Sequence, residues 1–157
     1  MQTTLYKSKI GNIKLTSHNN KLVRLDLNPV EQFENIASEF NEFVIFQLEE
    51  YFDRKRTLFE VPFDISSASD LNLRVWSEVS KIPYGQSTTY KTIAESIGRN
   101  KAYRAVGSAV GKNPIPIIIP CHRVIASNGG LGGFSLGLEV KLKLIKIEQM
   151  DGLKKSY

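Results

Sequence analysis

The residues of this chain with the most chemical potential are consecutive. Pro120, Cys121, His122 and Arg123 follow a segment, residues 114–119, that contains two further prolines. A thiolate is a strong nucleophile, but an unperturbed thiol has a pKa of about 8.5, so only a few per cent of it is ionised near neutral pH. A histidine and an arginine oriented toward the sulfur would raise that fraction, which makes Cys121 a candidate nucleophile. An alternative stays open here, because a lone cysteine is usually an inert core residue and its neighbours can be ordinary surface residues.

A carboxylate near the end of the chain is a candidate partner for the histidine. Residues 138–149 have helical periodicity, and one polar arc forms the expected solvent face: Glu139, Lys143 and Lys146. Glu148 lies outside that arc, between two apolar arcs and nearly eclipsed with Lys141. A carboxylate placed there faces protein and needs a partner. That partner is His122, or Lys141 in a purely structural ion pair.

Helices are expected to position these residues. The sequence predicts helices over residues 70–81, 90–97 and 101–112, with N-caps at Asp70, at Thr88 or Thr89, and at Asn100. The second and third are joined by about four residues and form a helix-turn-helix candidate. That pattern alone is weak, because many helical pairs bind nothing.

The outer face of the predicted helix 101–112 is made of small residues and one arginine: Arg104, Gly107, Ser108 and Gly111. A glycine inside a helix costs about 1 kcal/mol relative to alanine, so something should approach this backbone closely. Another helix would satisfy that requirement. Long base-reading side chains are absent, which favours contact with a narrow DNA groove over the wide major groove.

The first third of the chain has a different pattern. Residues 5–9, 13–17 and 22–27 are expected to form a meander of short strands, followed by helices over residues 30–40 and 42–54. Three aromatic residues are expected in the core of this part: Phe40, Phe43 and Phe46. The polar run after Pro62 is the expected boundary, giving domains 1–69 and 70–157. The predicted fold class is therefore α+β in two small domains: an N-terminal antiparallel sheet with helices, and a mainly helical C-terminal domain with a helix-turn-helix.

Composition limits the classes of protein to consider. Of the 157 residues 41% are hydrophobic and 24% charged, and the apolar runs are short, such as Phe43–Phe46 and Ile117–Ile119, so we expect no membrane span and a cytoplasmic location, nucleoid-associated in a prokaryote. The single cysteine allows no internal disulfide. Residues 1–69 carry a net charge of −2 and residues 70–157 one of +7. The second part has a surface suited to phosphates, although a solvated basic face would look the same.

The run from Pro120 to Val124 resembles the active-site motif of the O6-alkylguanine-DNA alkyltransferases. The resemblance covers most of residues 70–157 through several motifs in order: Val75-Trp76, Ile82-Pro83-Tyr84-Gly85, Thr89-Tyr90, Arg104-Ala105-Val106-Gly107, Gly111-Lys112-Asn113-Pro114, Gly132-Gly133-Phe134-Ser135 and Lys141. Residues 1–69 are similar to the family only in general layout.

The resemblance implies DNA repair by direct and irreversible transfer of an alkyl group from O6-alkylguanine to Cys121. O4-alkylthymine is left open as a further substrate, and neither a cofactor nor a metal is implied. By the same resemblance His122 is the base that deprotonates the thiol through a water, and Glu148 orients the histidine. Tyr90 donates a proton to the leaving guanine, and Arg104 enters the base stack as a finger.

The remaining implied contacts are with DNA and with the flipped base. We expect the first set to be Lys101, Arg104, Ala105, Gly107, Ser108 and Arg123. We expect the second set to be Asn113, Val124, Phe134, Ser135 and Leu136, the last where many members have glycine. The implied partner is double-stranded DNA carrying O6-alkylguanine, bound through its minor groove by a monomer.

Two other classes of protein fit these residues less well. A cysteine hydrolase needs Cys and His in positions that adjacent residues do not easily take, and the sequence has no oxyanion-hole motif. A helix-turn-helix protein without chemistry has no use for Cys121.

Overall fold

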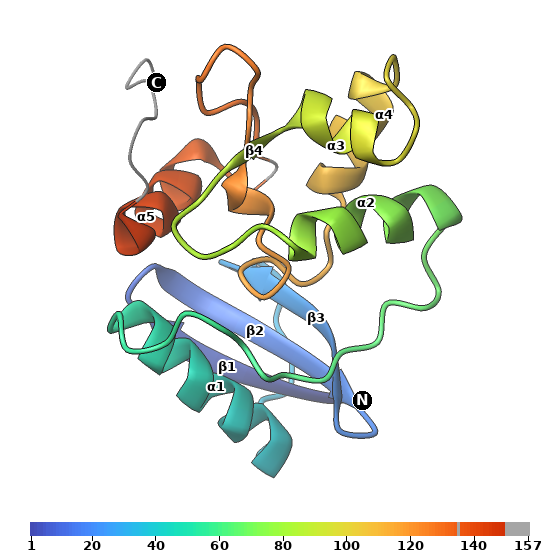
Figure 1. The fold of residues 1–157 in the computed structure, drawn as a ribbon. Coiled ribbons are helices and arrows are strands. Elements are labelled where there is room, and N and C mark those ends of the chain that lie inside the picture. Colours follow the sequence, from blue (N-terminus) through green and yellow to red (C-terminus); the bar gives the residue numbers. More distant parts are fainter. Residues whose placement is uncertain (135, 150–157) are drawn as a thin grey trace. The chain divides into compact units, whose positions relative to one another are not determined.

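The computed structural model describes residues 1–134 and 136–149 and consists of two units (Figure 1). The first unit is Met1–Ile65, and the second begins at Ser66. Within the described residues no helix is long and apolar enough to cross a membrane.

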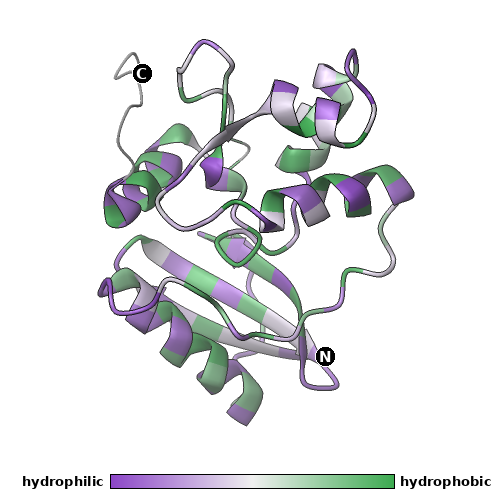
Figure 2. Cartoon of the chain, viewed as in Figure 1, coloured by the Kyte–Doolittle hydropathy of each residue, from purple (hydrophilic) through white to green (hydrophobic). Residues whose placement is uncertain are grey.

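The first unit contains a three-stranded antiparallel meander in the order β1 (Gln2–Ser8), β2 (Gly11–His18) and β3 (Lys21–Leu27). The predicted strands are confirmed; β1 begins three residues earlier and ends one residue earlier than expected, and β2 and β3 have slightly wider bounds. Asn19 and Asn20 both have positive φ in the turn between β2 and β3, a conformation that asparagine tolerates better than most residues. Figure 2 shows polar and apolar residues alternating along the strands, which is the pattern of a sheet with one buried face.

The helix α1 (Glu39–Phe52) packs against this sheet and begins at Ser38, whose side chain accepts a hydrogen bond from the Asn41 N–H. The predicted helix over residues 30–40 is wrong. That segment instead covers the edge of β1, where the Ile36 N–H donates to the Thr3 carbonyl oxygen at 2.7 Å. The other edge, at β3, is covered by residues 62–64.

The prediction that Phe43 and Phe46 are core residues is also wrong, since they are 45% and 59% exposed. The buried arc of α1 has a different phase and consists of Asn41, Val44, Ile45, Gln47, Leu48, Tyr51 and Phe52. Two phenylalanines three residues apart match a helical face, but their spacing alone does not say which face is buried.

The second unit is built from α2 (Asp70–Ser80), α3 (Tyr90–Ser96), α4 (Tyr103–Gly111) and α5 (Leu138–Glu148). The helical C-terminal part with its helix-turn-helix is confirmed. Ser69, not Asp70, caps α2, and Thr89 caps α3 as expected. Asn100 does not cap α4, which starts after Ala102 without a side-chain cap.

One contact holds two of the helices together, and a second joins the start of α3 to the segment that carries the cysteine. The Trp76 indole N–H donates to the Ala109 carbonyl oxygen at 2.8 Å and holds α2 against α4. The two-residue strands β4 (Thr88–Thr89) and β5 (Val124–Ile125) pair in parallel, Thr88 with Val124 and Thr89 with Ile125. Because Tyr90 follows β4 and Cys121 lies three residues before β5, this pairing brings Tyr90 close to the cysteine.

Candidate active site

Cys121 and His122 lie in a single 3-10 turn, Cys121–Arg123, directly before β5. The Cys121 N–H donates to the Ile119 carbonyl oxygen at 2.8 Å, and the Arg123 N–H to that of Pro120 at 2.9 Å. Both side chains are inside the protein, with 3% of Cys121 and none of His122 exposed. The turn thus presents a thiol and an imidazole from adjacent positions to the protein interior.

The Glu148 carboxylate is the centre of the hydrogen-bond network behind this turn. It is 2.5 Å from His122 Nε2, and it accepts hydrogen bonds from Arg123 Nε at 2.8 Å, Arg123 Nη2 at 3.1 Å and the Gly85 N–H at 3.0 Å. Burial alone would raise the pKa of Glu148, but His122 and Arg123 hold it well below its usual range. The carboxylate is therefore ionised near neutral pH.

Arg123 does not belong to a DNA-contacting surface, so that prediction is wrong. Its side chain is 8% exposed, because the guanidinium turns inward to pair with Glu148 and to donate to the Ile82 carbonyl oxygen at 2.7 Å. It also lies 5.8 Å from the centre of the Tyr84 ring. A buried guanidinium engaged on three sides is not available to a phosphate.

The protonation of His122 follows from its neighbours. Burial lowers the pKa of the imidazole, and the hydrogen bond to Glu148 opposes that shift only in part. The ring is thus neutral near pH 7, with its proton on Nε2 because the ionised carboxylate can only accept. Nδ1 is then left with its lone pair, and no side chain or backbone group among the described residues hydrogen-bonds to it. A buried, oriented imidazole with an unused acceptor has the chemical properties that a general base requires.

The thiol itself is not ionised in this state. Burial raises the pKa of Cys121 to about 11, while a hydrogen bond with Asn113 and the charge of Lys141 act in the opposite direction. The expectation that its His and Arg neighbours raise the thiolate fraction is therefore wrong for the protein without DNA. The charge of Arg123 is paired with that of Glu148, and His122 is neutral.

Asn113 closes the proline-containing segment that leads to the cysteine. Its Nδ2 donates to the Ile119 carbonyl oxygen at 2.7 Å, and its Oδ1 accepts from the Ile115 N–H at 2.9 Å. These bonds join the end of α4 to the segment that leads to Cys121. Asn113 also lies close enough to the sulfur to form a hydrogen bond with it.

Lys141, which the sequence left open as a possible ion-pair partner of Glu148, donates to backbone carbonyl oxygens instead. Its buried ammonium donates to the carbonyl oxygens of Val124 at 2.7 Å, Leu131 at 2.5 Å and Gly133 at 3.1 Å. Burial lowers its pKa to about 8. Because Lys141 lies off the polar arc of α5, the sequence indicated that it faces protein. The sequence alone does not show that backbone carbonyls are its partners.

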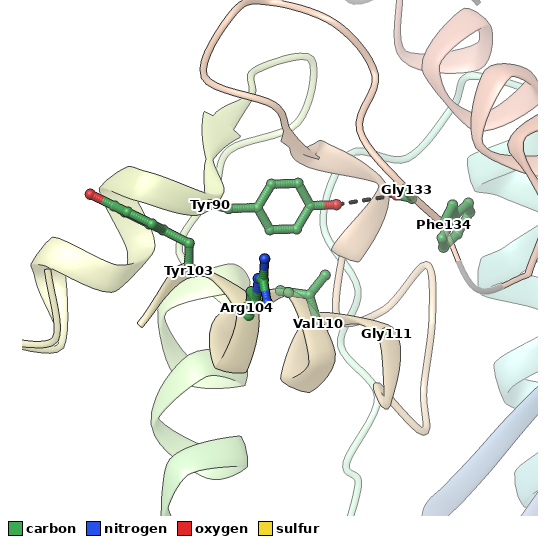
Figure 3. Close-up of a pocket in the computed structure, with 8 residues that line it drawn as sticks. Tyr90, Tyr103, Arg104, Val110, Gly111, Gly133 and Phe134 are labelled. Atoms are coloured by element: carbon green, nitrogen blue, oxygen red, sulfur yellow. Dashed lines mark hydrogen bonds between the residues drawn. The ribbon is translucent and has the colours of Figure 1, made fainter. Parts of the chain in front are cut away.

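A cavity of about 490 Å³ opens between α3, α4 and the loop before α5 (Figure 3). Its lining residues are Tyr90, Tyr103, Arg104, Gly107, Val110, Gly111, Gly133 and Phe134. The Tyr90 hydroxyl points across it and donates to the Gly133 carbonyl oxygen at 3.1 Å. Burial raises the pKa of Tyr90, and the neighbouring Cys121 raises it further, so the phenol keeps its proton.

Comparison with known proteins gives the family of this site. Residues 1–65 match the model of the 6-O-methylguanine DNA methyltransferase ribonuclease-like domain, and residues 70–150 match that of the DNA binding domain of the same proteins. The chain is 41% identical to the methylated-DNA–protein-cysteine methyltransferase of Methanosarcina barkeri, over 95% of this chain and 98% of the relative. The chain belongs to the 6-O-methylguanine DNA methyltransferase family.

Two further relatives of that family agree with this assignment. The methylated-DNA–protein-cysteine methyltransferase of Metallosphaera sedula is 44% identical over 91% of this chain and 90% of its own. The crystal structure of Mycobacterium tuberculosis OGT in complex with DNA superposes with a TM-score of 0.85 at 36% identity, covering 95% of this chain and 93% of that one.

The other residues expected to contact the base or the DNA fall into three groups. Phe134 lines the cavity, and Val124 is buried in β5 beside the catalytic turn. Leu136 is 36% exposed and is not a lining residue, and Ser135 lies outside the described residues. The remaining residues are on or just before α4, where Lys101, Arg104 and Ser108 are exposed and Ala105 and Gly107 are half-buried.

The sequence indicated that something approaches the backbone of the outer face of α4 closely, and the surroundings of Gly107 test whether that is another part of the described chain. A Cβ built on this glycine meets no heavy atom within 4 Å. Packing within the described part of the chain therefore does not require glycine there. The outer face of α4 is open to a partner from outside.

No metal centre is found in residues 1–134 and 136–149, where no three His, Cys, Asp or Glu side chains gather closely enough to hold an ion.

Proposed function

We propose that this protein repairs DNA by transferring an alkyl group from O6 of guanine to Sγ of Cys121 in a single, irreversible step. The observation that carries the proposal is the set of contacts around the turn: a buried thiol, a neutral imidazole with a free Nδ1, and an ionised carboxylate fixed on Nε2. This arrangement generates a thiolate only when His122 accepts the thiol proton, here through a bridging water.

The transfer is an in-line displacement at the alkyl carbon. The sulfur lone pair forms the S–C bond while the C–O bond breaks and its electron pair goes to guanine O6. Tyr90 supplies a proton to the departing base, so guanine leaves as a neutral molecule, and solvent returns the proton to Tyr90. The thiol proton remains on His122 until it passes to water. The product is a thioether, which has no leaving group that water could displace, so each molecule acts once.

The base reaches the sulfur by leaving the duplex. The O6 atom of a stacked guanine lies in the major groove, beyond the reach of a sulfur that is 3% exposed, so the nucleotide must rotate into the cavity at a cost of a few kcal/mol. The cavity volume falls in the range of small-molecule sites. Arg104 at its entrance is positioned to fill the gap in the stack, and its charge offsets part of the cost.

The surface of α4 favours the minor groove of double-stranded DNA. The backbone at Gly107 is open, Ala105 and Ser108 are small, and Lys101 and Arg104 supply positive charge at one end. A helix of this kind fits closely against a narrow groove, where shape and phosphate contacts matter more than base-specific hydrogen bonds. We propose that a monomer binds in this way, with Asn113, Val124 and Phe134 around the flipped base and the sulfur.

A single incubation tests the proposed function. Duplex DNA with a labelled methyl group at guanine O6 should transfer label to the protein in a one-to-one ratio, and mass spectrometry should place one methyl group on the peptide that contains Cys121. Cys121→Ala should take up no label but bind the same duplex almost as tightly, because the thiol contributes little surface. Label on the Cys121→Ala variant would identify a different acceptor, and continued turnover would indicate a hydrolase.

A further inference from the structure

An aromatic side chain is exposed on the outer face of α4, where most other residues are small. Tyr103 is the first residue of the helix, is 44% exposed and lines the same cavity as its neighbour Arg104. Among the described residues its hydroxyl has no hydrogen-bond partner and its ring meets no other ring or cation. Nothing in this part of the chain therefore explains a large, half-exposed aromatic residue at the edge of the site.

Tyr103 lies next to Arg104, the residue proposed to fill the gap that a flipped nucleotide leaves in the base stack. Consecutive residues of a helix point about 100° apart, so the two side chains diverge from adjacent backbone positions. Figure 3 shows Tyr103 at one end of the cavity and Phe134 at the other, with Tyr90 and Arg104 between them. A nucleotide entering the cavity passes Arg104, and the base pair beside the vacated position then lies toward Tyr103.

We propose that Tyr103 is an aromatic wedge that contacts the face of a base bordering the vacated position. This inference rests on the proposed function. When a nucleotide leaves the stack, the neighbouring base loses one stacking partner, and an aromatic ring at the edge of the groove replaces part of that contact. Arg104 fills the gap with charge, and Tyr103 covers the exposed base face with apolar surface.

The charge of the surroundings identifies the occupant as nucleic acid. Tyr103 stands between Lys101 and Arg104, and residues 70–157 carry a net charge of +7. Phosphates complement this surface. The same region of a second copy of the chain would be repelled, and an apolar peptide would leave both cations unpaired.

Transfer rates give the first test. On duplex DNA containing O6-methylguanine, Tyr103→Ala should react about tenfold more slowly than the unaltered protein, the low end of the cost of losing one base–aromatic contact. With free O6-methylguanine the two rates should be equal, because no stack is opened. Tyr103→Phe should keep the duplex rate, since the ring and not the hydroxyl makes the contact. Phe46→Ala is the matched control: it removes a ring that is 59% exposed in the first unit and should change neither rate.

A fluorescent base gives the second test, which reports the contact itself. With Cys121→Ala holding the complex before reaction, 2-aminopurine is placed on the 5′ side of the lesion, on its 3′ side or opposite it. Stacking on an aromatic ring quenches this base, so one of the two flanking positions should be dimmer with Tyr103 than with Tyr103→Ala in the same background. Equal fluorescence at both flanking positions, or a change only opposite the lesion, overturns the wedge.

The two proposals fail in different ways. If the unaltered protein takes up no methyl group from duplex DNA, the proposed function is wrong whatever Tyr103 does. If it takes up label and Tyr103→Ala reacts equally fast on duplex DNA, only the wedge is wrong. An equal loss on duplex DNA and free base would place Tyr103 in the fold or the pocket instead. Alanine is the best helix former, so the variant should keep α4 intact, and a thermal melt checks this.

Discussion

Replacing Glu148 by glutamine should separate the two roles that its carboxylate has in this structure. The carboxylate accepts four hydrogen bonds, from His122, from two nitrogens of Arg123 and from the Gly85 N–H. Glutamine offers one oxygen, and its NH2 group would face a donor. Arg123 would then be a buried guanidinium without its counter-charge. Breaking a buried ion pair in this way typically costs about 3–5 kcal/mol, a large part of the roughly 5–15 kcal/mol of a whole domain.

The loss in stability has a predicted pH range. The pKa of Glu148 is lowered in the folded protein, so its stabilising contribution is complete above the pKa of the unfolded chain, about 4.3, and is lost as the pH falls below it. Denaturant unfolding at pH 7 should show the full difference between the unaltered protein and Glu148→Gln, and the difference should narrow only below about pH 4. Glu139→Gln, on the exposed face of the same helix, is the control and should change stability very little.

The catalytic role appears in the transfer rate. Without the carboxylate, His122 loses the interaction that opposes the burial effect on its pKa and becomes a weaker base. Transfer by Glu148→Gln should slow far more than DNA binding weakens. The defect should shrink as the pH rises toward the thiol pKa of about 11, because a thiol that ionises by itself needs no base.

A double variant decides between the two roles. Arg123→Met combined with Glu148→Gln removes the unpaired charge and should recover more than half of the lost stability, because replacing both partners of a buried pair is far less costly than removing one. The transfer rate should stay low, since His122 still lacks its carboxylate. If transfer recovers together with stability, Glu148 is a structural residue and the reasoning about His122 is refuted.

Three further predictions use other contacts of the site. Gly132→Ala should slow transfer about tenfold or more, because the new Cβ would lie 2.9 Å from Tyr90 Cε2. The backbone of Gly132 also has a φ of +71°, which disfavours a side chain. A rate equal to that of the unaltered protein would contradict this prediction. Lys141→Met should shift the pH profile of iodoacetamide labelling of Cys121 to higher pH by removing a nearby positive charge, whereas Lys143→Met, exposed on the same helix, should leave it in place. Methylated Cys121 should lower the melting temperature, since an extra group in a buried site typically costs about 1–3 kcal/mol, and identical melts before and after reaction would mean a roomier pocket.

The sequence predicted best where a strong local rule coincided with a strong periodicity. Thr89 caps α3 as expected for a threonine, and the period of residues 138–149 correctly predicted that Glu148 faces the protein interior. It failed at α1 because Phe43 and Phe46 match a helical face that turned out to face solvent. Amphipathic spacing gives a period, and the phase is decided by which residues the sheet covers.

The inward orientation of the Arg123 side chain could not be predicted from the local sequence, for a different reason. It is next to His122 in a 3-10 turn of three residues, too short to show a periodicity, and arginine is mostly a surface residue. Its destination depends on Ile82 and Glu148, both of which are distant in sequence. The pairing of β4 with β5 is equally hidden, since two-residue strands carry no alternating pattern, yet it sets the position of Tyr90.

The burial of Cys121 explains why the protein reacts once and why it does not react earlier. Because burial raises the pKa of the Cys121 thiol to about 11, the thiol is almost entirely protonated at pH 7, which lowers its reactivity toward other electrophiles and oxidants. The charged form is the one that burial destabilises. Transfer replaces it with a neutral thioether, which the same dry surroundings favour. Burial therefore opposes the reverse reaction, because carbon–sulfur cleavage would have to regenerate a buried thiolate.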